Sequence, residues 1–199
     1  MKAEKMMQDY IAQSLEENIR LKTGILNDLS MRERIESLGT AMAQTLDRSG
    51  KILLCGNGGS AADAQHIAAE LVGRFSTERE GLAAIALTTD TSILTAVGND
   101  YGFDHVFERQ TAALGTKGDI FIGISTSGDS PNVVLALRKA RAMGMTTVGL
   151  LGKTGGQCLS LCDYSFVIPS GESARIQEAH ITIGHILCGI VDKIRAQKP

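Results

Sequence analysis

The most constraining feature of this sequence is a series of five short apolar segments separated by longer stretches of mixed character. None of the five shows a regular polar alternation, and the segments occupy residues 52–55, 83–87, 120–124, 147–151 and 164–168. Strands buried on both faces have this pattern, because a strand with one exposed face alternates with a period of two. The intervening stretches are long enough for crossover helices, so the strands should run parallel in a sheet covered on both sides. The sequence therefore predicts a three-layer α/β fold.

The first quarter of the chain shows helical periodicity instead. Apolar residues recur at steps of three and four over 11–19 and again over 35–46, with charged residues between them. We expect these two helices to form a hairpin over residues 1–49, ahead of the sheet. Ser30 is the expected N-cap of the second helix, with Glu33 three residues later to complete a capping box.

A single domain is expected, 1–199. Residues 50–199 should form the α/β core and end in one long, apolar-rich helix over 173–196. No linker, repeat or low-complexity stretch interrupts the sequence. A chain of 199 residues buries roughly 70% of the surface that its unfolded form exposes, which is enough for one well-packed core.

Composition and charge exclude several kinds of partner. The 20 Lys and Arg residues face 22 Asp and Glu residues, so the chain lacks the basic excess that nucleic-acid binding requires. No apolar run approaches the ~20 residues that span a bilayer, and the charged N-terminus does not resemble a secretory signal. The 4 cysteines are too few and too irregularly spaced for a disulfide framework. We therefore expect a cytoplasmic protein with reduced thiols and with neither nucleic acid nor a membrane as partner.

A glycine-rich loop follows the first predicted strand. Residues 55–60 read Cys-Gly-Asn-Gly-Gly-Ser and precede a helix, whose first N–H groups can bind an anion. With Ala61 the loop satisfies the loose dinucleotide fingerprint, but no acidic residue ends the second strand as a ribose partner should. On this pattern alone, a ligand loop with Asn57, Gly58 and Gly59 and a plain strand-to-helix turn are equally supported.

A loop rich in hydroxyl groups follows the third predicted strand. Residues 125–131 read Ser-Thr-Ser-Gly-Asp-Ser-Pro, and the proline suits the first turn of the next helix. The loop has no Lys or Arg, so N–H and O–H donors would have to hold an anion. A capped turn needs only one hydroxyl group. The four hydroxyl groups therefore favour a phosphate site.

Two helices contain the residues best suited to acid–base or metal chemistry. His66 and Glu70 are four residues apart and share a helix face, and Arg74 extends that face by another turn. A solvated Glu70–Arg74 ion pair is the simpler explanation, and a metal or acid–base site is the alternative.

The last predicted helix is apolar on most sides and is therefore expected to be buried, so its polar residues need partners. Gln177 and His185 are about 80° apart around its axis. His180 and His185 are about 140° apart, so both histidines cannot easily serve one site. Each of these polar residues, taken singly, is explained as a buried side chain with its hydrogen bonds satisfied. The group as a whole favours a functional site.

Together these motifs resemble the sugar-isomerase (SIS) domain family. The resemblance rests on residues 55–60, 125–130 and 175–178, and its characteristic pieces extend from about residue 50 to 190. Three further segments are most similar to the phosphoheptose isomerases within that family: residues 66–70, 98–100 and 180–185. The resemblance implies a three-layer, flavodoxin-like α/β fold with a five-stranded parallel sheet.

The resemblance also implies an activity. Phosphoheptose isomerases convert sedoheptulose 7-phosphate into D-glycero-D-manno-heptose 7-phosphate through an enediol, the first step towards ADP-heptose for bacterial lipopolysaccharide. They are cytoplasmic homotetramers with active sites at subunit contacts, and zinc occupies the site. The resemblance therefore implies a phosphorylated sugar as substrate, Zn²⁺ as cofactor, one per subunit, and further copies of the chain as partners.

The functional residues of the family carry over motif by motif. The positions that match its metal ligands are His66, Glu70, Gln177 and His185. The positions that match its phosphate loop are Ser125, Thr126, Ser127 and Ser130, and those that match other substrate contacts are Asn57, Gly58, Gly59, Asn99 and Asp100, with Glu70 and Gln177. By the resemblance, Glu70 is the base that moves the proton and His185 is the acid at the oxygen. Glutamine is a weaker zinc ligand than His or Cys, so weakly bound metal is expected.

The chain departs from the family at one motif. Many phosphoheptose isomerases have Asp directly before Arg-Ile-Gln-Glu, where this chain has Ala174, so a role of that Asp does not carry over. The same segment, together with Gln65, also resembles a non-enzymatic SIS relative that binds the bacterial replication initiator DnaA. That adaptor characteristically lacks the glutamate and the second histidine that stand here as Glu70 and His185. The residues therefore favour the isomerase, with the adaptor as the alternative.

Overall fold

The structure, a computed structural model, describes residues 2–197. Within these residues a five-stranded sheet has the order β2-β1-β3-β4-β5, with every pair of neighbours parallel. The strands are β1 (Ile52–Gly56), β2 (Ala84–Ala86), β3 (Ile120–Ser125), β4 (Thr146–Gly152) and β5 (Tyr164–Ile168). The five apolar segments of the sequence are the five strands, and their predicted parallel arrangement is confirmed.

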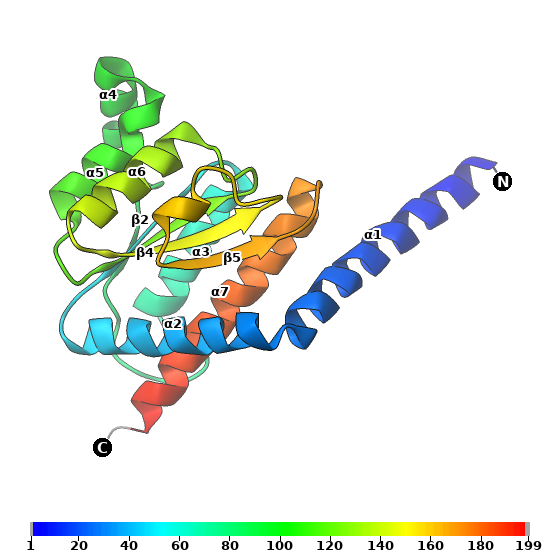
Figure 1. The fold of residues 1–199 in the computed structure, drawn as a ribbon, viewed down its shortest axis with the longest axis horizontal. Helices are drawn as coiled ribbons and strands as arrows, with labels where there is room; N and C mark the ends of the chain where they lie inside the picture. The colour runs from blue at the N-terminus through cyan, green and yellow to red at the C-terminus, as the bar shows by residue number, and fades with distance from the viewer. Residues whose placement is uncertain (1, 198–199) are drawn as a thin grey trace.

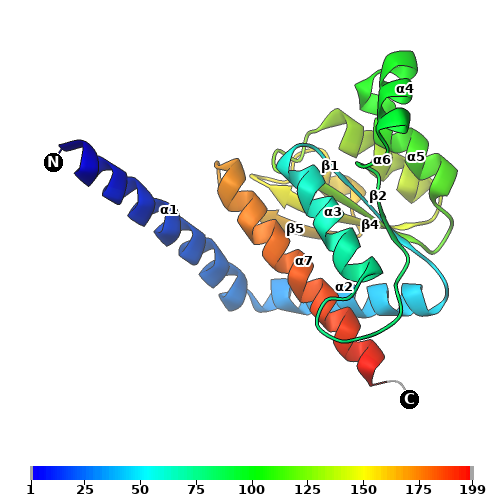
Figure 2. The same cartoon turned by 180° about the vertical axis from the view of Figure 1, so that it is seen from behind.

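Helices cover both faces of the sheet (Figures 1 and 2). They are α1 (Lys2–Asn27), α2 (Leu29–Asp47), α3 (Gly59–Val72), α4 (Thr91–Tyr101), α5 (Val106–Leu114), α6 (Pro131–Ala142) and α7 (Ser173–Ala196), with the short helices η1 (Phe103–His105) and η2 (Leu159–Leu161). Successive side chains of β1 enter different cores: Leu54 packs with residues of α2, α3 and α7, and Leu53 with residues of α5 and α6. The predicted three-layer α/β fold is confirmed.

The strand order places the ends of β1 and β3 side by side, where the chain changes direction across the sheet. Gly56, the last residue of β1, is opposite Ile124 of β3. The segments that follow are joined by two hydrogen bonds between the Asn57 and Asn132 amides, each 2.9 Å long. Ligands of open parallel sheets bind at such a point, beyond the carboxyl ends of the strands.

The two N-terminal helices are present, but the predicted hairpin is wrong. Only Asp28 lies between α1 and α2, and a reversal of direction needs a longer connection. As a result, α1 projects away from α2 and from the sheet (Figures 1 and 2). Near its middle it contacts α7: Ser14 O accepts a 2.5 Å hydrogen bond from Arg175, and the Asn18 amide donates to Glu178.

The cap of α2 also differs from the predicted one. Asp28, not Ser30, is the N-cap, because an Asp28 carboxylate oxygen accepts a 2.9 Å hydrogen bond from the N–H of Met31. Ser30 lies inside the helix, where its hydroxyl accepts a 2.7 Å hydrogen bond from Arg34. A carboxylate in this position also faces the positive end of the helix dipole, which favours Asp over Ser.

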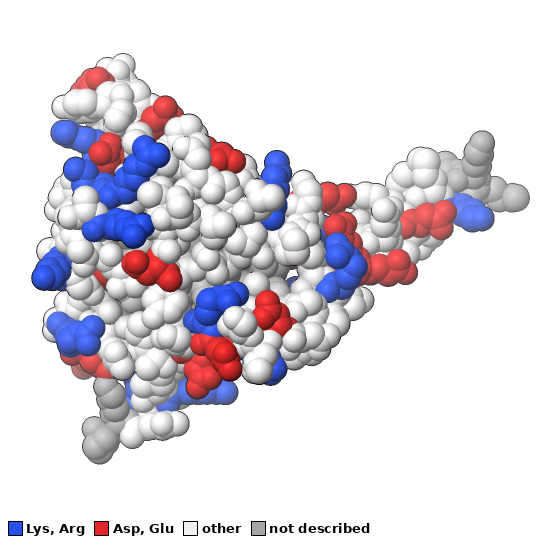
Figure 3. Space-filling view, in the orientation of Figure 1, with Lys and Arg blue, Asp and Glu red and all other residues white. Residues whose placement is uncertain are grey.

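The surface has charges of both signs. On the face shown in Figure 3, Lys and Arg side chains gather over α5 and α6, with Asp and Glu side chains among them. Both signs are interspersed over the rest of that face. Among the helices of the described residues, none combines the length and the apolar character that a membrane span requires.

Replacing Asp28 with Ala should lower the free energy of unfolding by about 1 kcal/mol, because the first turn of α2 loses its side-chain acceptor. Urea denaturation of the variant and the parent protein measures the difference. Ser30→Ala is the matched control and should change the free energy by less than about 0.5 kcal/mol. If Ser30→Ala lowered the free energy of unfolding as much as Asp28→Ala or more, the assignment of Asp28 as the N-cap would be contradicted.

Candidate active site

Three side chains suited to metal binding and acid–base chemistry meet between α3 and α7. His66 and Glu70 stand one turn apart on α3, and His185 approaches from α7. His66 Nε2 lies 2.9 Å from His185 Nε2 and 3.2 Å from Glu70 Oε1. One ligand atom from each residue lies within 4.8 Å of the other two. We call these residues the His–Glu cluster, and it contains three of the four predicted metal ligands.

The close approach of α3 and α7 depends on a glycine beside the cluster. A Cβ atom on Gly184 would lie 2.6 Å from Ile67 Cδ1, so any larger residue would have to displace the Ile67 side chain. Ile67 directly follows His66 and Gly184 directly precedes His185, and both are buried. This contact therefore helps to set the distance between the two imidazoles.

An aromatic ring absent from the sequence motifs lies against the cluster. Phe75 stacks on His185, with ring centroids 5.7 Å apart and 28° between the planes. His66 meets the His185 ring at a tilt of 59°, with centroids 5.0 Å apart. The two contacts restrict the orientation of His185. Phe75 stands in a segment without helical or strand periodicity, so its only signal in the sequence is its nearness to Glu70.

The geometry of the His–Glu cluster suits a divalent transition metal. Tetrahedral zinc with bonds of about 2.0–2.1 Å places neighbouring ligand atoms roughly 3.3 Å apart, close to the 2.9 and 3.2 Å observed. Two imidazole nitrogens and a carboxylate oxygen form a donor set that zinc accepts in proteins. Without a cation, one of the two facing nitrogens must carry a hydrogen. The residues present therefore fit a metal ion.

Gln177, the fourth predicted ligand, lies on the first turns of α7 against the start of α3. The Cβ atom that Gly59 lacks would fall 2.5 Å from Gln177 Nε2, so the Gln177 amide fills the space over this glycine. Gly58 is the N-cap of α3 and has a φ of 55°, a conformation that favours glycine. Both glycines of the predicted ligand loop are thus required by the local backbone and packing. The roles of Gln177 and of residues 57–59 toward a ligand stay predictions.

Three of the four predicted hydroxyl groups gather at the end of β3. Ser125 Oγ lies 2.9 Å from Ser130 Oγ and 3.3 Å from Ser127 Oγ, and it accepts a 3.1 Å hydrogen bond from the N–H of Gly128. The fourth hydroxyl, that of Thr126, accepts a 3.4 Å hydrogen bond from Ser173 at the start of α7. Ser130 is the N-cap of α6 but makes no side-chain cap hydrogen bond. A capped turn does not account for this arrangement, and phosphate binding here stays a prediction.

The hydroxyl-rich loop of residues 125–131, here called the hydroxyl loop, is held in place by the loop that follows β4. Gly128 has a φ of 73°, and a Cβ atom on it would lie 2.2 Å from Gly155 O. The N–H of Cys158 donates to Gly128 O at 2.9 Å, and the N–H of Gln157 donates to Asp129 at 2.9 Å. These contacts fix the loop in one conformation before any ligand binds.

The predicted substrate contacts Asn99 and Asp100 lie elsewhere. They are exposed near the end of α4, where the Asn99 amide donates to Asp100 at 2.8 Å. α4 packs mainly against η1 and α5, on the opposite side of the sheet from α7 (Figure 1). Within one copy of the chain, these two residues are therefore separate from the His–Glu cluster.

Asp63 is an ionisable neighbour of the cluster, whereas Arg74 is paired outside it. The simpler explanation of the α3 motif is wrong, because Glu70 lies against His66 while Arg74 pairs with Glu78 at 3.4 Å. Asp63 is not among the residues that the sequence motifs predict for the site, although it stands one turn before His66. Burial raises the pKa of Asp63 to about 6, and the nearby His66 opposes that rise. The i, i+3 spacing is the signal that would have identified Asp63.

His180 is buried apart from the cluster. Its Nε2 lies 3.0 Å from Leu151 O near the end of β4, and its Nδ1 has no hydrogen-bond partner among the described residues. Burial lowers the pKa of His180 to about 4, although the hydrogen bond to Leu151 acts in the opposite direction. His180 and His185 therefore do not share a site, as their angular separation on the helix predicts.

Comparisons with known proteins identify relatives along most of the chain. A family profile described as the SIS domain matches residues 20–152. A phosphoheptose isomerase of Aneurinibacillus thermoaerophilus is 53% identical over 187 residues, which cover 94% of each chain. Solved structures of phosphoheptose isomerases from Neisseria gonorrhoeae and Francisella tularensis superpose with TM-scores of 0.87 and 0.89, at 46% and 40% identity. These matches cover 94% of this chain and 99% and 98% of the solved chains.

The buried imidazole of His180 should make the stability of the protein depend on pH. Its pKa is about 4 in the folded chain and ~6.5 in an unfolded one, so the unfolded state takes up the proton first as the pH falls. Through this group the free energy of unfolding should fall by about 2 kcal/mol between roughly pH 7.5 and pH 5. In His180→Gln the free energy of unfolding, measured by urea denaturation, should not show this part of the decrease with falling pH.

The matched control is His105→Gln, which removes a more exposed histidine and should keep the full pH dependence of the parent protein. Glutamine at position 180 retains an N–H donor for Leu151 O. The same pH dependence in His180→Gln as in the parent would contradict the assignment of the loss to this imidazole.

Proposed function

The chain belongs to the SIS-domain family and, within it, to the phosphoheptose isomerases, and from this membership we propose that it converts sedoheptulose 7-phosphate into D-glycero-D-manno-heptose 7-phosphate. The observation that carries the proposal is the meeting of His66, Glu70 and His185 in a chain of this family. The product would supply the synthesis of ADP-heptose for lipopolysaccharide. The alternative of an adaptor for the initiator DnaA receives no support from the relatives of the chain.

The reaction moves one proton between adjacent carbons while a carbonyl and a hydroxyl group exchange places. The Glu70 carboxylate takes the proton from C1 of the ketose and returns it to C2, by way of an enediol. His185 donates a proton to O2 as the enediol forms and takes the proton of the O1 hydroxyl as the aldehyde forms, so it ends the reaction protonated as it began. No other reactant is needed, because product and substrate are isomers. A ligand atom of the Glu70 carboxylate and one of the His185 imidazole, on facing helices, lie within 4.8 Å of each other, which supports this pairing of base and acid.

The hydroxyl loop binds the phosphate group of the substrate in this proposal. Its donors are the hydroxyls of Ser125, Thr126, Ser127 and Ser130, beside the positive end of the α6 dipole. A phosphate held at the far end of the sugar limits where C1 and C2 can lie, which lowers the entropic part of the barrier. Contacts from Asn57, Gly58, Gly59 and Gln177 would orient the sugar between the loop and the His–Glu cluster.

We also propose one Zn²⁺ per subunit at the His–Glu cluster, with Gln177 as a further ligand. The ligand-atom spacing in the cluster supports the site, and the amide ligand favours weak, exchangeable binding. When bound, the metal supplies positive charge that polarises the oxygens of the sugar. His66 then serves to hold the metal, and the contact with Phe75 keeps His185 oriented toward it.

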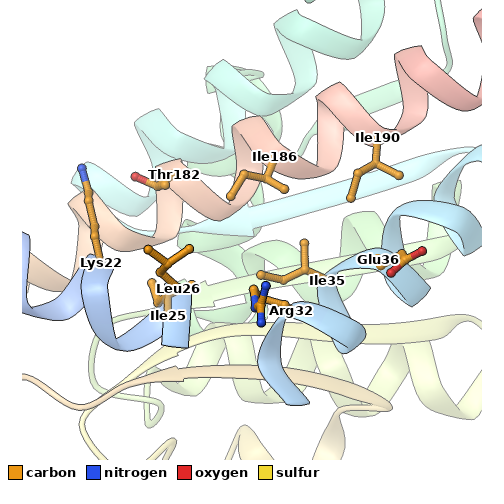
Figure 4. A pocket seen from close by; sticks show the side chains of 9 residues that line it. All are labelled: Lys22, Ile25, Leu26, Arg32, Ile35, Glu36, Thr182, Ile186 and Ile190. Carbon is orange, nitrogen blue, oxygen red and sulfur yellow. The ribbon is translucent and has the colours of Figure 1, made fainter. Parts of the chain in front are cut away.

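A homotetramer with active sites at subunit contacts is the proposed assembly. The described part of α1 exposes an apolar face, formed by Met6, Met7, Tyr10, Ile11, Leu15 and Ile19. An apolar groove of about 330 Å³ lies where α1, α2 and α7 meet, with Ile35 and Ile186 on facing walls (Figure 4). Apolar surface of this extent is usually covered in an assembly, and α1 of a second copy has the complementary character.

The same assembly gives Asn99 and Asp100 a role. One copy holds them apart from its own His–Glu cluster, so as substrate contacts they would serve the site of a neighbouring copy. A cytoplasmic location is also part of the proposal, because a sugar phosphate has a charge that is costly to bring across a membrane.

Incubation of the zinc-supplemented protein with sedoheptulose 7-phosphate in D₂O should place deuterium at C2 of an aldose phosphate. The proton removed from C1 exchanges with solvent while Glu70 holds it, so the returned atom is deuterium. NMR and mass spectrometry of the product measure the incorporation. Absence of any aldose phosphate would refute the proposed function.

Glu70→Gln should lower turnover in this assay at least ~100-fold and leave the fold intact, because the amide cannot accept the proton. Glu108→Gln is the matched control: Glu108 also pairs with a histidine, His105, at 2.7 Å, but outside the His–Glu cluster. It should keep the activity of the parent protein. An active Glu70→Gln protein would refute the assignment of the base.

Replacing Leu15 with Glu should dissociate the assembly, because it puts a charge in the middle of the apolar face of α1. Sedimentation equilibrium of the variant and the parent protein measures the mass. Leu159→Glu places the same charge at an exposed leucine away from α1 and should leave the mass unchanged. A tetramer that withstands Leu15→Glu would contradict the role of this face.

A further inference from the structure

The segment between α3 and β2, residues 73–83, is fastened to α7 by one buried carboxylate. Asp192 is only 1% exposed, and its Oδ2 accepts hydrogen bonds from the N–H groups of Ser76 and Thr77 at 2.8 and 3.1 Å. The hydroxyls of the same two residues donate to it at 3.3 and 3.1 Å, and Arg79 Nε donates to Oδ1 at 2.7 Å. Asp192 therefore holds a mostly exposed segment in one conformation.

Arg79 extends this connection to the C-terminal end of α3. Its Nη2 donates to Glu70 O at 2.9 Å, and its Nη1 donates to Leu71 O at 2.8 Å and to Gly73 O at 3.2 Å. The last carbonyl groups of a helix have no partner within the helix, and a positive charge is favourable beside them. Arg79 thus binds the backbone of Glu70 itself while its Nε pairs with α7.

The same connection reaches the other half of the His–Glu cluster. Asp192 lies about two turns after His185, so the two side chains share a face of α7. Phe75, which stacks on the His185 ring, directly precedes the two residues that Asp192 binds through their N–H groups. Displacement of this segment would therefore move Phe75 relative to His185 and release the end of α3.

We propose that Arg79 and Asp192 are positioning residues, which set the spacing of α3 and α7 at the His–Glu cluster and hold Phe75 against His185. Neither residue is among the predicted ligands or substrate contacts. The proposal rests on the proposed function only for its kinetic consequence, since the spacing of the cluster is a property of the chain alone.

Ionised groups suit such a task. Burial acts to raise the pKa of Asp192, but hydrogen bonds from Arg79, Ser76 and Thr77 outweigh it and lower the pKa to about 2. The guanidinium group stays protonated at every accessible pH, so the pair is charged over the whole range in which enzymes work. Hydrogen bonds between ionised groups are shorter and stronger than neutral ones, and they resist small displacements. A displacement of ~1 Å is enough to slow a reaction on the order of 100-fold.

The chain offers a matched control in a second buried ion pair, which joins the starts of β1 and β3. Asp119 is also 1% exposed, pairs with Lys51 Nζ at 2.7 Å, and accepts further hydrogen bonds from the N–H groups of Lys51 and Thr116. Lys51 and Asp119 directly precede β1 and β3, so this pair lies at the amino ends of the strands. It resembles the Arg79–Asp192 pair in burial and bonding, but it connects β1 with β3 and not α3 with α7.

The experiment compares Asp192→Asn with Asp119→Asn in the full-length chain. The readouts are the ¹⁵N resonances of the imidazoles without metal, the affinity for Co²⁺ as a spectroscopic probe, and kcat and KM with sedoheptulose 7-phosphate. Asp192→Asn should shift the resonances of His66 and His185, weaken Co²⁺ binding about 10- to 100-fold, and lower kcat on the order of 100-fold with little change in KM. Asp119→Asn should lower Tm to a similar degree and leave the three readouts at parental values.

Arg79→Lys is the second variant, because it keeps a positive charge but loses the fork that reaches both helices. It should show the same resonance shifts even if Asp192→Asn does not fold. Parental His66 and His185 resonances in the folded variants would overturn the proposal, whatever the substrate of the protein, since this readout needs neither metal nor turnover. Equal effects in Asp119→Asn would also overturn it. A parent protein that fails to isomerise the heptulose phosphate would instead count against the proposed function.

Discussion

Two-sided burial of the central strands is the constraint on which the rest of the structure depends. Every residue of β1 and β3 is buried, so helices must cover both faces and functional groups collect beyond the ends of the strands. At the carboxyl ends the chain places the glycines that begin α3 and the hydroxyl loop that begins α6. Because β1 and β3 are neighbours, these two loops lie next to each other and can contact opposite parts of one ligand.

The loops and the helices of this edge have different tasks. In the proposed function the hydroxyl loop supplies neutral donors for an anion, whereas the proposed acid–base and metal-binding groups stand on α3 and α7. Helices hold side chains more precisely than loops do, and the two helices are fixed relative to each other at two points. One is the contact of Gly184 with Ile67 inside the cluster, and the other is the Arg79–Asp192 pair beyond it. In the proposed function, proton transfer would depend on this spacing, whereas phosphate binding would depend on the donors of the hydroxyl loop.

Most of the fold could be predicted from the sequence because apolar periodicity reports burial directly. The five strands and the last helix follow from it. The helical spacing puts Glu70 one turn from both His66 and Arg74, so it does not decide between them, and the structure pairs Glu70 with His66. The predicted hairpin was wrong because hydrophobic periodicity carries no information about the connection between α1 and α2, which is the single residue Asp28. Asp28 and Ser30 are both good capping residues two positions apart, a difference that sequence patterns do not resolve. The roles of Phe75 and of the Arg79–Asp192 pair could not be predicted from the sequence, because their contacts join residues far apart in the chain. Phe75 and Arg79 also lie in a segment that lacks helical or strand periodicity.

The first turns of α7 connect the surface that α1 exposes with the proposed site. Arg175 and Glu178 stand on either side of Gln177, and both bind α1, through Ser14 and Asn18. Gln177 itself packs on Gly59 at the start of α3. A shift of α1 would therefore first displace the turn of α7 that contains Gln177, the proposed amide ligand. Ala174, where the chain departs from the motif it resembles, lies in the same turn and is exposed, and none of these contacts involves its side chain. The helix whose apolar face is proposed to contact other copies is thus anchored beside Gln177, so the proposed assembly and the geometry of the proposed site would depend on the same turn of α7.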